Sequence, residues 1–133
     1  MSENLDLVRT IGGSWERGDF SSAAWADPKI EYVFADGPDP ASWQGMSEMA
    51  EGFRAFVGAW VGYRIDAEEY RALDGERVLV LFHDSGRGRA SGLELRELQE
   101  GRAFLFCLSN CRVTRLVVYW DRSQALADLG LEE

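Results

Sequence analysis

The stretch from Arg102 to Leu131 constrains the fold most, because it predicts a β-hairpin followed by a short helix. Its two apolar segments, Ala103–Ser109 and Arg112–Trp120, are rich in the β-branched and aromatic residues that favour strands. The dipeptide between them, Asn110-Cys111, predicts a tight turn. Alternation assigns one face of the second strand to Val113, Arg115, Val117 and Tyr119, and the other to Thr114, Leu116, Val118 and Trp120. Both faces are mainly apolar, so we expect both to be covered by protein.

The helix after the hairpin is expected to begin at Asp121. Asp121 and Gln124 have the spacing of a capping box, in which the carboxylate accepts a helix N–H and the glutamine reaches back. Gly130 predicts the end of this helix. An aspartate after Tyr119 and Trp120 could also be catalytic, but capping accounts for it fully, and we favour the cap.

The earlier elements are expected in a segregated order, with helices and one strand first and a run of strands afterwards. The expected elements are a helix over residues 4–17, a short helix Phe20–Ala26, a strand Lys29–Phe34, a helix whose apolar stripe runs from Met46 to Trp60, and strands Tyr63–Leu73, Val78–Asp84 and Leu93–Gln99. This order predicts an α+β fold with an antiparallel sheet, and 133 residues suit a single domain over the whole chain. Gly12-Gly13 inside the first helix indicates either close packing against a bulky group or space for a ligand.

The composition of the chain indicates which partners it does not bind and in which cellular compartment we expect it. A formal net charge of −9 argues against nucleic acids and anionic membrane surfaces as partners. No apolar run approaches the roughly 20 residues that span a bilayer, and the N-terminus has no signal-peptide core, so we expect a cytoplasmic protein. One histidine with Cys107 and Cys111 does not make a zinc site, so we expect no metal and no cofactor.

Aromatic residues are the most abundant candidates for a binding site. Five Trp, four Tyr and seven Phe recur in separate elements, mostly on faces that would meet inside a curved sheet. An apolar pocket with few polar groups is the usual form of a small-molecule site. A core packed with rings would give the same sequence pattern, so both interpretations remain open at this point.

His83 is the single histidine and the first candidate for acid/base chemistry. It lies beside Asp84, but neighbours in a strand point to opposite faces and cannot form a dyad. A carboxylate from an adjacent strand, such as Asp66, Glu68 or Glu97, would be needed to make His83 a plausible acid or base. The alternative, a histidine at the rim or outer surface of the sheet, is favoured.

Four motifs carry a resemblance that covers nearly the whole chain. They are Trp15-Glu16-Arg17-Gly18-Asp19 at the end of the first helix, Gly45 before the main helix, the Gly86–Gly92 loop before a strand, and Tyr119-Trp120-Asp121-Arg122 with Ala125-Leu126 and Gly130-Leu131 at the C-terminal end. With the order of elements, they resemble the NTF2-like superfamily, in its SnoaL-like, ketosteroid-isomerase-like branch. Fold resemblance of this kind does not specify an activity.

The resemblance implies a cone-shaped α+β fold. A curved, mostly antiparallel sheet would wrap around three N-terminal helices, with a short C-terminal helix, and would enclose a pocket. It also implies a homodimer formed through the outer face of the sheet. Members include ketosteroid isomerases, epoxide hydrolases, polyketide cyclases and ligand binders without known chemistry.

The catalytic positions of these enzymes are not kept in this sequence. Those of ketosteroid isomerases fall at Ile11, Tyr32 and near Phe104, and the catalytic aspartate of epoxide hydrolases falls at Val118. Isoleucine, phenylalanine and valine have no proton to transfer, and tyrosine is a poor base at neutral pH. The resemblance therefore favours an apolar pocket without the known catalytic groups.

Our leading hypothesis is a cytoplasmic, homodimeric protein that binds a small, mainly apolar molecule, with Tyr32 as the main polar contact. The expected lining residues are Trp15, Tyr32, Phe53, Trp60, Phe104, Phe106, Val118 and Trp120. The alternative is an isomerase, cyclase or hydratase with His83 or Asp36 as acid/base and Tyr32 as oxyanion donor. A second alternative is a non-catalytic, dimeric interaction module whose aromatic residues fill the cone completely.

Overall fold

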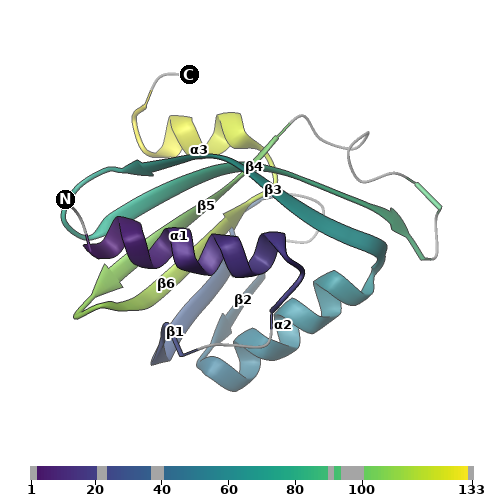
Figure 1. The fold of residues 1–133 in the computed structure, drawn as a ribbon, viewed down its shortest axis with the longest axis horizontal. Coiled ribbons are helices and arrows are strands. Elements are labelled where there is room, and N and C mark those ends of the chain that lie inside the picture. The colour runs from purple at the N-terminus through teal and green to yellow at the C-terminus, as the bar shows by residue number, and fades with distance from the viewer. Residues whose placement is uncertain (1–2, 21–23, 37–40, 90–91, 94–100, 132–133) are drawn as a thin grey trace.

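The computed structural model describes residues 3–20, 24–36, 41–89, 92–93 and 101–131 (Figure 1). Its helices are α1 (Glu3–Glu16), α2 (Met46–Gly58) and α3 (Arg122–Asp128). Its strands are β1 (Ala26–Phe34), β2 (Ala41–Gln44), β3 (Trp60–Ala72), β4 (Arg77–Gly88), β5 (Arg102–Ser109) and β6 (Arg112–Tyr119). None of the described helices is long and apolar enough to cross a membrane.

The described strands form one curved sheet in the order β2-β1-β6-β5-β4-β3. β1 pairs with β6 in parallel, and the other neighbouring pairs are antiparallel. The predicted α+β class with a mostly antiparallel sheet is therefore confirmed. The parallel pair brings the N-terminal strand beside the C-terminal strand, and so joins the two ends of the fold.

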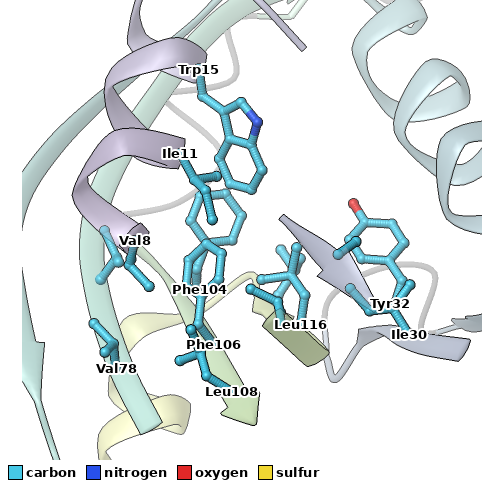
Figure 2. Close-up of a cluster of buried hydrophobic side chains, with 14 of the residues drawn as sticks. Val8, Ile11, Trp15, Ile30, Tyr32, Val78, Phe104, Phe106, Leu108 and Leu116 are labelled. Atoms are coloured by element: carbon cyan, nitrogen blue, oxygen red, sulfur yellow. The ribbon is translucent and has the colours of Figure 1, made fainter. Parts of the chain in front are cut away.

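Helices cover both faces of the sheet, with α1 and α2 on the inner face and α3 on the outer face (Figure 1). Strand β4 shows the alternation, because Val80 and Phe82 pack in the inner core while Leu79 and Leu81 pack in the outer core beneath α3. The inner core also receives the apolar stripe of α1, namely Val8, Ile11 and Trp15 (Figure 2). Both faces of the central strands are thus covered, as their composition predicted.

The C-terminal hairpin has the predicted turn. Asn110 and Cys111 have φ values of 52° and 60°, and two consecutive positive values are typical of the tight type I′ hairpin turn. The predicted faces hold for the later part of β6 but fail for Val113, which packs in the inner core together with Leu116. The reason is a shift in register between Cys107 and Leu108, which interrupts the alternation.

The predicted helix Phe20–Ala26 is wrong at its C-terminal end. Trp25 lies in a turn and Ala26 begins β1, while residues 21–23 lie outside the described part of the chain. The Val113 N–H donates to the Trp25 carbonyl at 2.9 Å, so pairing with β6 overrides the local helical preference. Two helices, rather than three, are therefore described on the inner face. Strand β2 was not expected, and the predicted strand Leu93–Gln99 falls mostly on residues that are not described.

Gly12 marks a close contact between α1 and β3. A Cβ at this position would lie 2.1 Å from the Tyr70 Oη, so only glycine allows the observed approach. Of the two interpretations of the glycine pair, close packing against a bulky group therefore holds for Gly12. At this point the backbone of α1 packs against the Tyr70 side chain of β3.

The cap at Asp121 is confirmed, because Ser123 N–H donates to its Oδ1 at 2.9 Å. The second half of the predicted capping box is wrong, since the Gln124 side chain donates instead to Asp128 at 2.8 Å. We expect Asp121→Ala to lower the free energy of unfolding by about 1 kcal/mol, measured by urea denaturation. Asp121→Ser retains an acceptor and should lose much less. Equal losses in the two variants would contradict the capping role.

Candidate functional site

A cavity of about 560 Å³ lies between α2 and the inner face of the sheet. Its walls are mainly aromatic and aliphatic, with two charged side chains, Asp36 and Arg102. The apolar part of the wall consists of Phe34, Trp43, Gly52, Ala55, Phe56, Ala59, Trp60, Val118 and Trp120. Small-molecule sites usually enclose roughly 300–1,000 Å³ and combine apolar walls with a few polar groups. This cavity has both properties.

A second void of only about 10 Å³ adjoins the cavity. Four residues line both spaces, namely Phe34, Phe56, Arg102 and Val118. The other residues that line this void are Phe20, Tyr32, Phe53, Val57, Tyr63, Ile65 and Phe104. A void of this size holds about one water molecule. Of these two adjoining spaces, only the larger cavity has room for more than a water molecule.

The structure divides the predicted lining residues into three groups. Trp60, Val118 and Trp120 line the cavity. Tyr32, Phe53 and Phe104 border only the small void. Phe106 borders neither and lies in the core, while Trp15, also a core residue, lines a separate pocket of about 300 Å³ beside α1.

Trp15 is a core residue because α1 packs directly onto the sheet. Its ring is 3% exposed, and ring centroids of Phe104 and Phe53 lie 5.1 Å and 5.4 Å away. Figure 2 shows Trp15 and Ile11 of α1 next to Phe104 and Phe106 of β5. This packing buries Trp15 between α1 and the sheet, and the open space beside α2 is larger than the pocket of about 300 Å³ beside α1.

Tyr32 is buried against α2, with its ring stacked on Phe53 at 4.8 Å. Burial raises the pKa of Tyr32 well above its usual value. The phenol therefore stays protonated and can act as a hydrogen-bond donor, but not as a base. Its position on the small void separates it from the main cavity.

His83 lies on the outer face of the sheet, away from the cavity. Its Nδ1 is 2.9 Å from Glu68 Oε1, so the expected carboxylate from the adjacent strand is present. The same oxygen of Glu68 accepts a hydrogen bond from Arg122 at the start of α3, which lowers the pKa of Glu68. His83 is therefore part of an ionic cluster beneath α3, and it cannot reach a ligand in the cavity.

Asp36 lies in the cavity wall but is already hydrogen-bonded. One carboxylate oxygen accepts the backbone N–H of Trp120 at 2.6 Å, and the other accepts that of Asp121 at 3.2 Å. These bonds connect the segment after β1 to the end of β6. They hold the carboxylate at the wall.

A buried network of Arg102, Asp84 and Tyr63 was not predicted from the sequence. Arg102 and Asp84 are 2% and 1% exposed, and Arg102 Nη1 donates to Asp84 Oδ2. Tyr63 Oη donates to the same oxygen at 2.7 Å. Burial, together with the Asp84 charge, raises the pKa of Tyr63 well above its usual value. This network places one fixed guanidinium in a mainly apolar wall.

Strand alternation contained the signal for this network. The pattern that directs Phe104 and Phe106 inward also directs Arg102 inward, and the same holds for Phe82 and Asp84 on β4. A charged residue at an inward position on each of two strands suggests a buried pair. The pairing of β4 with β5, with Phe82 opposite Arg102, then brings the two charges together.

Gly52 allows α2 to approach the aromatic residues of the wall. An added Cβ would lie 3.0 Å from the Trp43 ring and 3.2 Å from that of Tyr32, whereas Gly58 on the same helix faces open space. Gly52 is inside the helix and Gly58 is its last residue, so Gly52→Ala gains at least as much helix propensity, and the difference between the variants is a lower bound on the strain. We expect Gly52→Ala to be less stable than Gly58→Ala by about 1–3 kcal/mol in urea denaturation. Equal stabilities would show that the rings move away freely.

No group of His, Cys, Asp and Glu side chains within the described residues is arranged to hold a metal ion. The two cysteines are free, with Cys107 half-buried and Cys111 exposed. The groups that a ligand in the cavity could contact are thus the aromatic rings, one guanidinium and one hydrogen-bonded carboxylate.

No known family profile matches this sequence, and no curated protein does. Solved structures do match. An NTF2-like protein from Burkholderia thailandensis E264 superposes with a TM-score of 0.76 at 18% identity, covering 99% of this chain and 100% of that chain. A candidate SnoaL-like polyketide cyclase from Jannaschia sp. CCS1 has a TM-score of 0.71 at 12% identity, covering 98% and 93%. TerC, co-crystallised with polyporic acid, has a TM-score of 0.72 at 17% identity, covering 96% and 98%.

These similarities define the class of fold. The protein has an NTF2-like fold, which confirms the fold that the sequence motifs implied. At these identities the similarity concerns the fold, and the function has to be argued from the cavity.

Proposed function

We propose that this protein binds a small, mainly apolar molecule in the cavity between α2 and the sheet. The cavity itself is the observation that carries the proposal, because its volume of about 560 Å³ and its aromatic walls suit such a ligand. TerC, which has a similar fold, was co-crystallised with polyporic acid, and this supports a binding role. The open cavity counts against the alternative in which aromatic side chains fill the cone completely.

A thermal-shift screen with hydrophobic metabolites tests the proposal. A ligand that binds only the folded state raises the melting temperature, and the rise saturates with concentration. Ala55→Trp places a large ring in the cavity from an exposed position of α2, and should abolish the shift. Ala127→Trp makes the same change at an exposed position of α3, outside the cavity wall, and should retain it. Equal shifts in both variants would contradict binding in this cavity.

A second candidate function is an isomerase, cyclase or hydratase. The presence of a candidate polyketide cyclase among proteins of the same fold favours it, as does a carboxylate in the cavity wall. Asp36 would be the acid/base, since His83 lies on the other face. Incubating the protein with a ligand from the screen and following its conversion by mass spectrometry tests this candidate. Turnover that Asp36→Asn abolishes, with binding retained, would support it; an unchanged ligand would exclude it for that compound.

We also propose the homodimer, in the cytoplasm, that the family resemblance implies. The part of the outer face formed by Leu79, Leu105 and Val117 packs with α3, so a partner would contact the strands beside that helix. Light scattering coupled to size-exclusion chromatography should give twice the mass of the chain. A monomer at micromolar concentration would contradict the dimer.

A further inference from the structure

Two hydrogen-bond donors of the cavity wall lack a partner. Trp60 Nε1 and Arg102 Nε are buried, and neither has an acceptor within the described part of the chain. Both residues line the cavity. Buried polar groups in proteins are nearly always hydrogen-bonded, so two unpaired donors in one wall require an explanation.

The guanidinium of Arg102 has spare hydrogen-bonding capacity. It carries five N–H donors, and Asp84 is its hydrogen-bond partner among the described residues. Its carbon lies 5.0 Å from the ring centre of Phe56 and 5.2 Å from that of Trp120, which both line the cavity. These rings and Asp84 hold the guanidinium at the wall, so a ligand would meet donors that are already oriented.

The unpaired groups of the wall are donors, whereas its carboxylate is already occupied. Both oxygens of Asp36 accept backbone N–H groups, as described above. Among the described residues, the wall thus has two unpaired donors, Trp60 Nε1 and Arg102 Nε, which an acceptor on a ligand would satisfy. Tyr63 also donates to Asp84, and this second bond helps that carboxylate to stay in place while the guanidinium contacts another group. Hydrogen bonds from a guanidinium to an anionic oxygen are stronger than those to a neutral one.

This inference rests on the proposed function and specifies its ligand. We propose that the cavity binds a ring-containing organic acid whose carboxylate or enolate oxygen accepts hydrogen bonds from Arg102 and Trp60. The apolar walls would contact the rings, and the two donors would fix the oxygen at the β5 end of the cavity. TerC, which has a similar fold, was co-crystallised with polyporic acid.

A matched pair of probes tests the inference. Anthracene-9-carboxylate and anthracene-9-methanol share one ring system and differ in the anionic oxygen, and isothermal titration calorimetry gives the affinity of each. We expect wild-type protein to bind the carboxylate about tenfold more tightly, or better. The ratio of the two affinities is the quantity to follow in the variants, because it cancels general losses of ring contact.

Trp60→Phe removes the N–H and keeps an aromatic ring, so it should lower the affinity ratio several-fold. Trp43→Phe makes the same exchange at another position of the same wall, where no buried unpaired N–H is found, and should leave the ratio unchanged. The double variant Asp84→Asn/Arg102→Gln removes both charges together and should bring the ratio close to one. Circular dichroism checks its folding; if it does not fold, the two tryptophan variants decide the question.

The outcomes separate this inference from the proposed function. Equal affinities of wild type for the two probes, or equal ratios in Trp60→Phe and Trp43→Phe, would overturn the acid preference and leave the apolar site standing. Binding of neither probe would contradict both proposals. A high ratio in wild type that falls only in Trp60→Phe and in the double variant would support the inference.

Discussion

Replacing Arg102 with methionine is expected to lower the free energy of unfolding by about 3–5 kcal/mol. Arg102 is the buried cation that compensates Asp84, and both residues are almost completely excluded from solvent. Methionine fills a similar volume, but leaves the Asp84 carboxylate buried without its guanidinium partner, although the Tyr63 hydroxyl still donates to it. Urea denaturation followed by circular dichroism measures the loss.

Two controls show whether the loss comes from the unpaired charge. Asp84→Asn/Arg102→Met removes both charges and should recover much of the stability, since a neutral pair has no isolated ion. Arg77→Met breaks the exposed ion pair of Arg77 and Asp74, whose Nε and Oδ2 are 2.9 Å apart, and should change stability little. A double variant as unstable as Arg102→Met would show that packing around the guanidinium, rather than charge, is the main contribution.

Trp15→Ala is expected to lower the free energy of unfolding by about 3–5 kcal/mol, because it leaves a cavity in the centre of the inner core. The Trp15 ring contacts rings from α2 and β5, and it is 3% exposed. Trp43→Ala removes the same side chain from a half-buried position in the wall of the cavity beside α2, and should cost clearly less. Thermal or urea denaturation of the two variants tests the division between core and cavity wall. A smaller loss of stability for Trp15→Ala than for Trp43→Ala would contradict the assignment of Trp15 to the core.

The local elements near the C-terminus were the most predictable part of the fold. The hairpin turn at Asn110-Cys111 and the cap at Asp121 depend on residues close together in the sequence, and both were found where expected. The helix stripe beginning at Met46 was also predicted, although the helix ends at Gly58 and Trp60 begins a strand. Errors occurred where distant segments pair, as at Trp25, whose carbonyl accepts from β6.

The candidate site was less predictable, because periodicity assigns a side chain to a face but gives no distance to the opposite element. Trp15 and Trp60 were equally good lining candidates in sequence, yet the first is covered by the core and the second lies in the cavity wall. Their difference follows from how closely α1 and α2 approach the sheet. Gly12 permits the tight contact of α1 with Tyr70, while the space beside α2 remains open.

The sequence alone determined the α+β class, the faces of most central strands and the capping of the last helix, since these depend on alternation and on neighbours along the chain. Only the tertiary structure decided which rings enclose a cavity, that His83 lies on the outer face and that Arg102 and Asp84 meet inside. Those outcomes depend on strand register and on the separation of packed layers. Both quantities arise from contacts between residues far apart in the chain, so local patterns do not contain them.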